Sequence, residues 1–240
     1  MQAPIEGGAI GAAIRTSLTS VVIVGGLLLV PAGLVPGGTW VWPRAIAFVA
    51  GCGAISGIGN LALARWRPEH FRVRQQSVVA ARAARQPLAD AVGSAALLAI
   101  GAAWLAFIPI DVFALHALAP PSPWISLIGG AASLVGLALT PMAAWENRFA
   151  TPNVQIQAAQ TVVRSGIYRL IRHPIYLGNL LFAGGAALWL GSYAGLWGFA
   201  VLLIATIARI RIEEKNLLSR VPDYAAYARD VRARLIPFLI

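Results

Sequence analysis

Six long apolar runs constrain the fold of this 240-residue chain more than any other feature of its sequence. They cover residues 16–35, 40–64, 90–110, 124–145, 177–191 and 193–208. A helix needs about 20 apolar residues to cross the roughly 30 Å hydrocarbon layer of a membrane. The composition agrees, because 12% of the residues are charged, against about 25% in soluble domains. We therefore predict an all-α fold, a polytopic integral membrane protein.

The last two runs are short for full spans, so the predicted number of transmembrane helices is five or six. Residues 177–191 and 193–208 could instead form a tilted or partly inserted hairpin. We divide the chain into an N-terminal region, 1–145, which holds the first four helices and a polar connection at 65–89, and a C-terminal region, 146–240. The segment 110–123 is predicted to be a short turn in which Asp111 and His116 could pair, and the first hairpin is expected to turn from Pro31 onward.

The net charge of +10 is distributed as in a membrane protein rather than as in a nucleic-acid-binding protein. Arginines fill the connections after the second and fourth runs and the C-terminal tail, whereas Arg44 lies toward the opposite side. Cytoplasmic loops of membrane proteins carry this excess, so both termini and both long connections are predicted to be cytoplasmic, in contact with anionic lipid heads. Apart from Lys215 and the histidines, every basic residue is arginine, and alanine is abundant. This bias suggests a GC-rich bacterial genome and hence the bacterial inner membrane.

Two further features bear on chemistry. In the connection 65–89, Trp66 and Phe71 are interleaved with arginines, which favours an interfacial amphipathic helix over a solvated loop. Cys52 is the single cysteine, so an intrachain disulfide and a thiolate metal cluster are excluded, and we expect no metal site.

Polar residues concentrate at the mouth of the fifth apolar run. Residues 166–178 include Tyr168, Arg172, His173 and Tyr176. Pro174 suits the first turn of a helix, and the free amides of a helix start favour an anionic group. We therefore expect a helix to begin here and to face an anion.

A second polar cluster follows the sixth run and consists of Arg209, Arg211, Glu213, Glu214 and Lys215. Arg209 and Glu213 are four residues apart and so share one helix face. The apolar hairpin would join both clusters into one polar site at a membrane face. Alternatively, these polar residues are interfacial anchors whose charged ends extend to the lipid head groups. Ionisable groups at membrane depth are, however, treated by default as candidates for function.

The ordered motifs of residues 145–240 resemble those of the isoprenylcysteine carboxyl methyltransferase family. The run R-H-P-I-Y-L-G at 172–178 matches its R-H-P-x-Y-x-G signature, and Glu213-Glu214 matches its downstream pair of glutamates. The family shares both motifs with phospholipid methyltransferases. Three further elements follow the family's order of motifs: an N-x-F element at Asn147, the run D-Y-A-A-Y at 223–227 and the run R-L-I-P at 234–237.

The resemblance implies S-adenosyl-L-methionine as cofactor, in a cytoplasmic pocket formed by the C-terminal half, and a lipophilic acceptor that enters from the bilayer. Two positions depart from the family pattern, Gln160 where histidine is common and Ile167 where proline is usual. Arg209 and Glu213 would be the catalytic residues, at the substrate side of the methyl group. The implied cofactor-binding residues are Gln160, Thr161, Val162, Val163, Tyr168, Arg172, His173, Pro174, Ile175, Tyr176, Gly178 and Glu214.

The acceptor decides which residue matters most. A carboxylate acceptor needs only orientation, which Arg209 could provide, whereas an amine or thiol must lose a proton, for which Glu213 is the plausible general base. An isoprenylcysteine-like carboxyl, a phospholipid amine and a small thiol therefore stay open as acceptors. Membrane lipids are the expected partners, and the sequence sets no oligomeric state. A nicotinamide-dependent membrane reductase and a non-catalytic lipid- or partner-binding protein are the alternatives from other classes.

Overall fold

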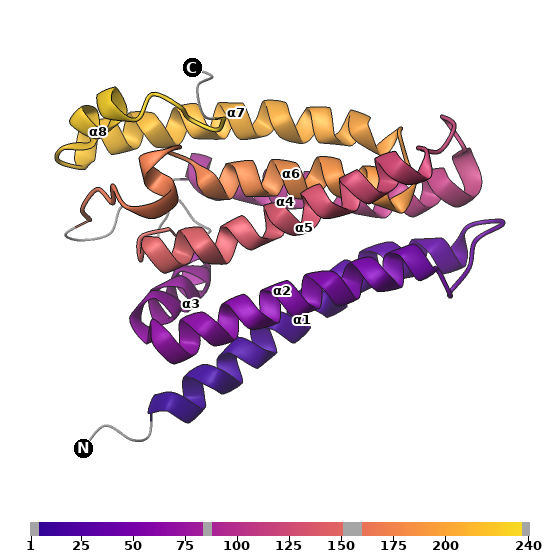
Figure 1. The fold of residues 1–240 in the computed structure, drawn as a ribbon, viewed down its shortest axis with the longest axis horizontal. Helices are drawn as coiled ribbons and strands as arrows, with labels where there is room; N and C mark the ends of the chain where they lie inside the picture. Colours follow the sequence, from indigo (N-terminus) through magenta and orange to yellow (C-terminus); the bar gives the residue numbers. More distant parts are fainter. Residues whose placement is uncertain (1–4, 84–87, 151–159, 237–240) are drawn as a thin grey trace.

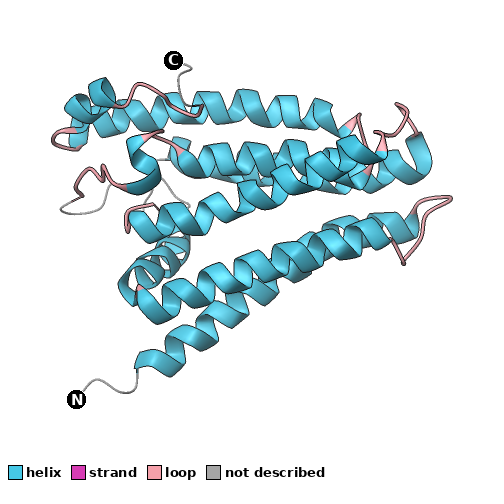
Figure 2. Ribbon diagram, viewed as in Figure 1, coloured by secondary structure: helices cyan, strands magenta, loops and turns pink. Residues whose placement is uncertain are grey.

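In the computed structural model, residues 5–83, 88–150 and 160–236 are described, and within them every regular element is a helix (Figure 2). The α-helices are α1 (Ile5–Leu34), α2 (Pro43–Trp66), α3 (Pro68–Ala83), α4 (Leu88–Ile110), α5 (Pro123–Glu146), α6 (Pro174–Leu190), α7 (Gly195–Arg220) and α8 (Tyr224–Asp230). A π-helix, η1 (Asp111–Leu115), extends α4, and a 3-10 turn, η2 (Gly166–Arg169), precedes α6. The all-α prediction is confirmed. The alternating sequence V-Q-I-Q at 154–157 predicts a short extended stretch, but these residues lie outside the described ones.

Five of these helices are long and apolar enough to cross a membrane, namely α1, α2, α4 with its π extension, α5 and α7. The sixth apolar helix, α6, has 17 residues, which corresponds to about 26 Å. It lies beside α5 and α7. In Figure 1 the long helices run lengthwise along the molecule, and α3, η2 and α8 lie at the end where α1 begins and α7 ends. The chain is thus a multi-pass integral membrane protein, as predicted.

Two helices extend further than the apolar runs or turns suggest, and each has a local cause. The last apolar run ends at residue 208, but α7 continues to Arg220, because its charged residues face either other polar groups or the outside of the bundle. Pro31 lies inside α1, and the turn comes only after Leu34, where Gly37 adopts a φ of 75°. Glycine populates that left-handed region at no steric cost.

The turn after α4 also differs from the prediction. Asp111 does not pair with the His116 side chain: its Oδ2 accepts a hydrogen bond from Ser192 Oγ at 2.6 Å and its Oδ1 accepts one from the Ala117 amide at 3.0 Å. Asp111 is buried inside the π-helix. It therefore joins α4 to the α6–α7 connection at the end of the bundle remote from α8.

Helices α5 and α6 approach each other closely along a line of glycines. A Cβ at Gly136 would lie 2.5 Å from the Gly178 carbonyl oxygen, and one at Gly178 would lie 2.5 Å from the Gly136 carbonyl oxygen. Gly129 and Gly185 repeat this arrangement nearer the other end of the helices. Small residues at such crossings let helix backbones touch in lipid, where packing drives association. The α5–α6 pair therefore fixes where the mouth of α6 lies.

Because no side chain fits at that crossing, Gly136→Ala is expected to destabilise the protein by about 1–3 kcal/mol through overpacking. Thermal unfolding in detergent measures the effect. The matched control is Gly57→Ala in α2, where an added Cβ meets nothing within 4 Å and alanine raises helix propensity. A midpoint for Gly136→Ala equal to that of Gly57→Ala would show that the two helices are not locked at this point.

Candidate active site

A cavity of about 420 Å³ lies at the end of the bundle where α7 and α8 meet. This volume is within the range of small-molecule sites, roughly 300–1,000 Å³. The walls come from the start of α6, the segment 160–163, α7 and α8, together with residues of α3, α4 and α5. The C-terminal half therefore supplies most of the wall of this cavity, and α3 and α4 contribute as well.

Most residues predicted to bind the cofactor or to act in catalysis lie around this cavity. Both predicted catalytic residues line it, and so do ten predicted cofactor residues: Gln160, Thr161, Val162, Val163, Tyr168, Arg172, His173, Pro174, Ile175 and Tyr176. Gly178 and Glu214 are not among the lining residues. Gly178 packs against Gly136, and Glu214 is engaged by cations on another side of α7.

The start of α6 is built as the sequence predicted. Pro174 is the first helical residue, and His173 is the N-cap, with no side-chain capping bond. The backbone before it is held by the C-terminal segment: the Arg172 amide donates to the Ala233 carbonyl and the His173 amide to the Arg234 carbonyl, both at 3.0 Å. The segment 231–236, called the strap below, thus lies across the N-terminal end, or mouth, of α6 and fixes the backbone that enters the cavity wall.

The Glu214 carboxylate joins three parts of the chain. Its Oε1 lies 3.0 Å from Arg172 Nη2 and 3.2 Å from His173 Nε2, and its Oε2 accepts a hydrogen bond from Arg234 Nε at 2.8 Å. The side chains of Arg172, His173 and Glu214 are each at least nine-tenths buried. Removing one partner of such a buried pair leaves an uncompensated charge. Glu214 therefore couples α7, the mouth of α6 and the strap.

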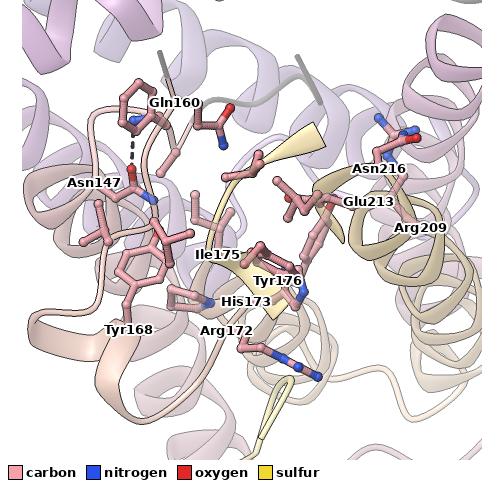
Figure 3. A pocket seen from close by; sticks show the side chains of 18 of the residues that line it. Asn147, Gln160, Tyr168, Arg172, His173, Ile175, Tyr176, Arg209, Glu213 and Asn216 are labelled. Carbon is pink, nitrogen blue, oxygen red and sulfur yellow. Dashed lines mark hydrogen bonds between the residues drawn. The ribbon is translucent and has the colours of Figure 1, made fainter. Parts of the chain in front are cut away.

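On the cavity side of α7, Arg209 and Glu213 lie on one helix face, as their spacing predicted (Figure 3). The Tyr176 hydroxyl donates to Glu213 Oε2 at 2.8 Å, which connects α6 to α7 across the cavity. Arg209 is buried, with 6% of its surface exposed. This wall combines a cation, a carboxylate and a phenol, a set that can orient and deprotonate a reacting group.

The opposite part of the cavity is aromatic and apolar. The rings of Tyr224 and Tyr227 in α8 lie 5.8 Å apart in an edge arrangement and pack with Val162 and Val221. The Tyr227 hydroxyl donates to the Tyr168 carbonyl at 2.8 Å. Burial raises the pKa of Tyr227 to about 12 and also raises the pKa of Tyr224. Both phenols therefore stay protonated at neutral pH.

Two buried polar atoms among the described side chains have no hydrogen-bond partner, the Tyr224 hydroxyl and Arg172 Nε. Both residues line the cavity. An unsatisfied buried donor costs about 1–3 kcal/mol. A ligand with acceptor atoms at this end of the cavity would remove that cost.

Sequence reasoning missed the contributions of α3 and α4. Arg74 of α3 lines the cavity, and its Nη1 donates to the Ala150 carbonyl at 3.3 Å. Leu97 and Leu98 of α4 line it as well, and Leu98 is 75% exposed, so the cavity extends to the outer face of that helix. These residues lie at least 60 positions before the R-H-P run, outside the region 145–240 that carries the motifs, so no motif includes them.

Glu214→Gln is expected to destabilise the protein by about 3–5 kcal/mol, because it leaves Arg172 and His173 buried without a carboxylate. The control is Asp230→Asn, which removes the ion pair with Arg164 at 2.8 Å between half-exposed side chains and should cost at most about 1 kcal/mol. Chemical unfolding in detergent measures both. Equal losses in the two variants would contradict a structural role for Glu214.

Comparison with known proteins bears on this site. No curated protein sequence matches the chain. Residues 124–223, from the start of α5 past the end of α7, match a family model described as phospholipid methyltransferase. The matched segment contains the R-H-P run, Arg209 and Glu213. Over this segment the chain is similar to the phospholipid methyltransferases, which belong to the integral-membrane methyltransferases.

Proposed function

We propose that the protein transfers the methyl group of S-adenosyl-L-methionine to a carboxylate at the end of a lipophilic acceptor, as isoprenylcysteine carboxyl methyltransferases do. The observation that carries the proposal is the placement of Arg209 and Glu213 on the cavity wall, with Tyr176 hydrogen-bonded to Glu213. The family match supports methyl transfer to a lipid-like substrate over a nicotinamide-dependent reductase or a non-catalytic protein.

The residues around the aromatic end of the cavity fit the cofactor. Tyr224 and Tyr227 offer aromatic rings against which a base could pack, and the unpaired Tyr224 hydroxyl and Arg172 Nε offer donors to its acceptor atoms. When bound, S-adenosylmethionine supplies an electrophilic methyl group on a positively charged sulfur. We assign its binding to the ten predicted residues that line the cavity, and we assign Gly178 and Glu214 to positioning them.

The charges in the cavity favour an anionic acceptor. Arg74, Arg172 and Arg209 line it, and Glu213 is the one carboxylate among its described lining residues. One oxygen of Glu213 already accepts the Tyr176 hydrogen bond. In this proposal Arg209 orients the acceptor carboxylate, and no general base is needed. Alignment in a water-poor site then supplies much of the acceleration.

The lipophilic part of the acceptor has a path into the cavity. Leu97 and Leu98 bring the cavity to the outer face of α4, which is a candidate membrane span. An acyl or prenyl chain could lie in this wall while its polar end reaches Arg209. We place this end of the bundle in the cytoplasm, where the cofactor is made and where the positive-inside rule puts the arginines. Both termini are then cytoplasmic, in a bacterial inner membrane.

Tyr224→Phe removes the unpaired phenol and is expected to weaken binding of S-adenosylhomocysteine, the demethylated product, by roughly three- to tenfold, the value of one hydrogen bond. Calorimetry on the protein in nanodiscs measures the affinity. The affinity for methylthioadenosine, which lacks the amino-acid end, should fall by the same factor in this variant. A loss confined to S-adenosylhomocysteine would place the phenol at the amino-acid end instead. Tyr193→Phe, in the α6–α7 connection, is the matched control and should bind as the wild type does.

Two measurements distinguish the acceptor classes: the alkali stability of the labelled product and the turnover of two variants. With labelled cofactor and membrane lipid extract, a carboxyl methyl ester releases its label as methanol in alkali, whereas methylated amines and thiols keep it. We expect alkali-labile label, a loss of about 10²–10³ in turnover for Arg209→Gln, and a loss below about tenfold for Glu213→Gln. Alkali-stable label with the larger loss in Glu213→Gln would replace the carboxylate by an amine or thiol, with Glu213 as general base.

A further inference from the structure

A second, shallower groove lies on the outer side of α7, at the same end of the bundle as the cavity. It has a volume of about 440 Å³ and shares no lining residue with the cavity. Its lining residues are Arg211, Glu214, Lys215, Leu218, Ser219 and Arg234. The proposed methyl transfer uses none of the cations among them.

The groove carries an excess of positive charge. Three cations line it against one carboxylate, Glu214, and that carboxylate is already engaged by Arg172 and by Arg234. Arg211 and Lys215 are exposed, and the Arg234 side chain is half exposed. The groove is therefore a site for an anion, and arginine in particular matches phosphate oxygens with two parallel donors.

The position of the groove on α7 places it at a membrane boundary. Ile204 lies two turns and Ile207 one turn before Arg211 on the same helix face, and their exposed fractions are 69% and 38%. Lys215 and Leu218 continue this face, which is opposite to the face that carries Arg209 and Glu213. An apolar stripe exposed on a membrane span thus runs directly into a basic groove.

We propose that this groove binds the phosphate of an anionic phospholipid, whose acyl chains lie along Ile204 and Ile207. Basic pockets beside membrane spans recognise such head groups. The lipid is a resident ligand outside the cavity, so the inference goes beyond the proposed methyl transfer. It accounts for a basic helix face that catalysis leaves unused.

The groove is connected to the cavity through Arg234. The Arg234 guanidinium donates a hydrogen bond to the Glu214 carboxylate, and the Arg234 carbonyl accepts one from the His173 amide at the mouth of α6. A phosphate on the half-exposed Arg234 guanidinium would hold the strap 231–236 in place. Lipid binding is thereby expected to stabilise the protein and the cavity wall together.

The test compares thermal unfolding of the full chain in nanodiscs of phosphatidylcholine alone and of phosphatidylcholine with phosphatidylglycerol. The wild type should gain about 4 °C with phosphatidylglycerol, and Arg211→Gln/Lys215→Gln should lose most of that gain. Arg229→Gln/Arg232→Gln removes the same charge from exposed positions outside the groove and should keep it.

An equal gain in all three proteins would overturn the proposal, because the effect would then be general surface attraction. Glycerophosphate added to phosphatidylcholine nanodiscs separates the lipid from its head group. A gain as large as that from phosphatidylglycerol would make the groove a site for soluble phosphate and contradict the lipid assignment. Unfolding is measured without cofactor or acceptor, so these outcomes are independent of whether the methyl-transfer proposal holds.

Discussion

The architecture of the site depends on the buried carboxylate of Glu214. One oxygen meets Arg172 and His173 at the mouth of α6, and the other meets Arg234 in the C-terminal strap. Charges this deeply buried are tolerated only when they are paired and hydrogen-bonded. The pairing therefore requires α6, α7 and the strap to come together, and the cavity lies beside the point where they meet.

Helix α7 carries two different polar surfaces on opposite faces. Arg209 and Glu213 face the cavity, whereas Arg211 and Lys215 line the outer groove, and Glu214 lies buried with its cations between them. A spacing of two residues turns a side chain by about 200° around a helix. The dense run of charges at 209–215 is thus compatible with a continuous helix, because each charge meets a different environment.

The sequence alone predicted the helical class, the α6 start at Pro174 and the shared face of Arg209 and Glu213, because periodicity, proline geometry and motif spacing are local signals. It did not predict that Glu214 contacts the start of α6 rather than lining the cavity, since this depends on partners from distant segments. Arg74 and Leu97 were missed for the same reason: tertiary packing brings α3 and α4 to the cavity.

The central claim is that the cavity binds a methyl donor, and direct titration of the purified wild-type protein in nanodiscs tests it. We predict saturable, one-to-one binding of S-adenosylmethionine and of S-adenosylhomocysteine, and no binding of a reduced nicotinamide. Binding of the reduced nicotinamide without binding of either sulfur compound would contradict the account and would favour a membrane reductase.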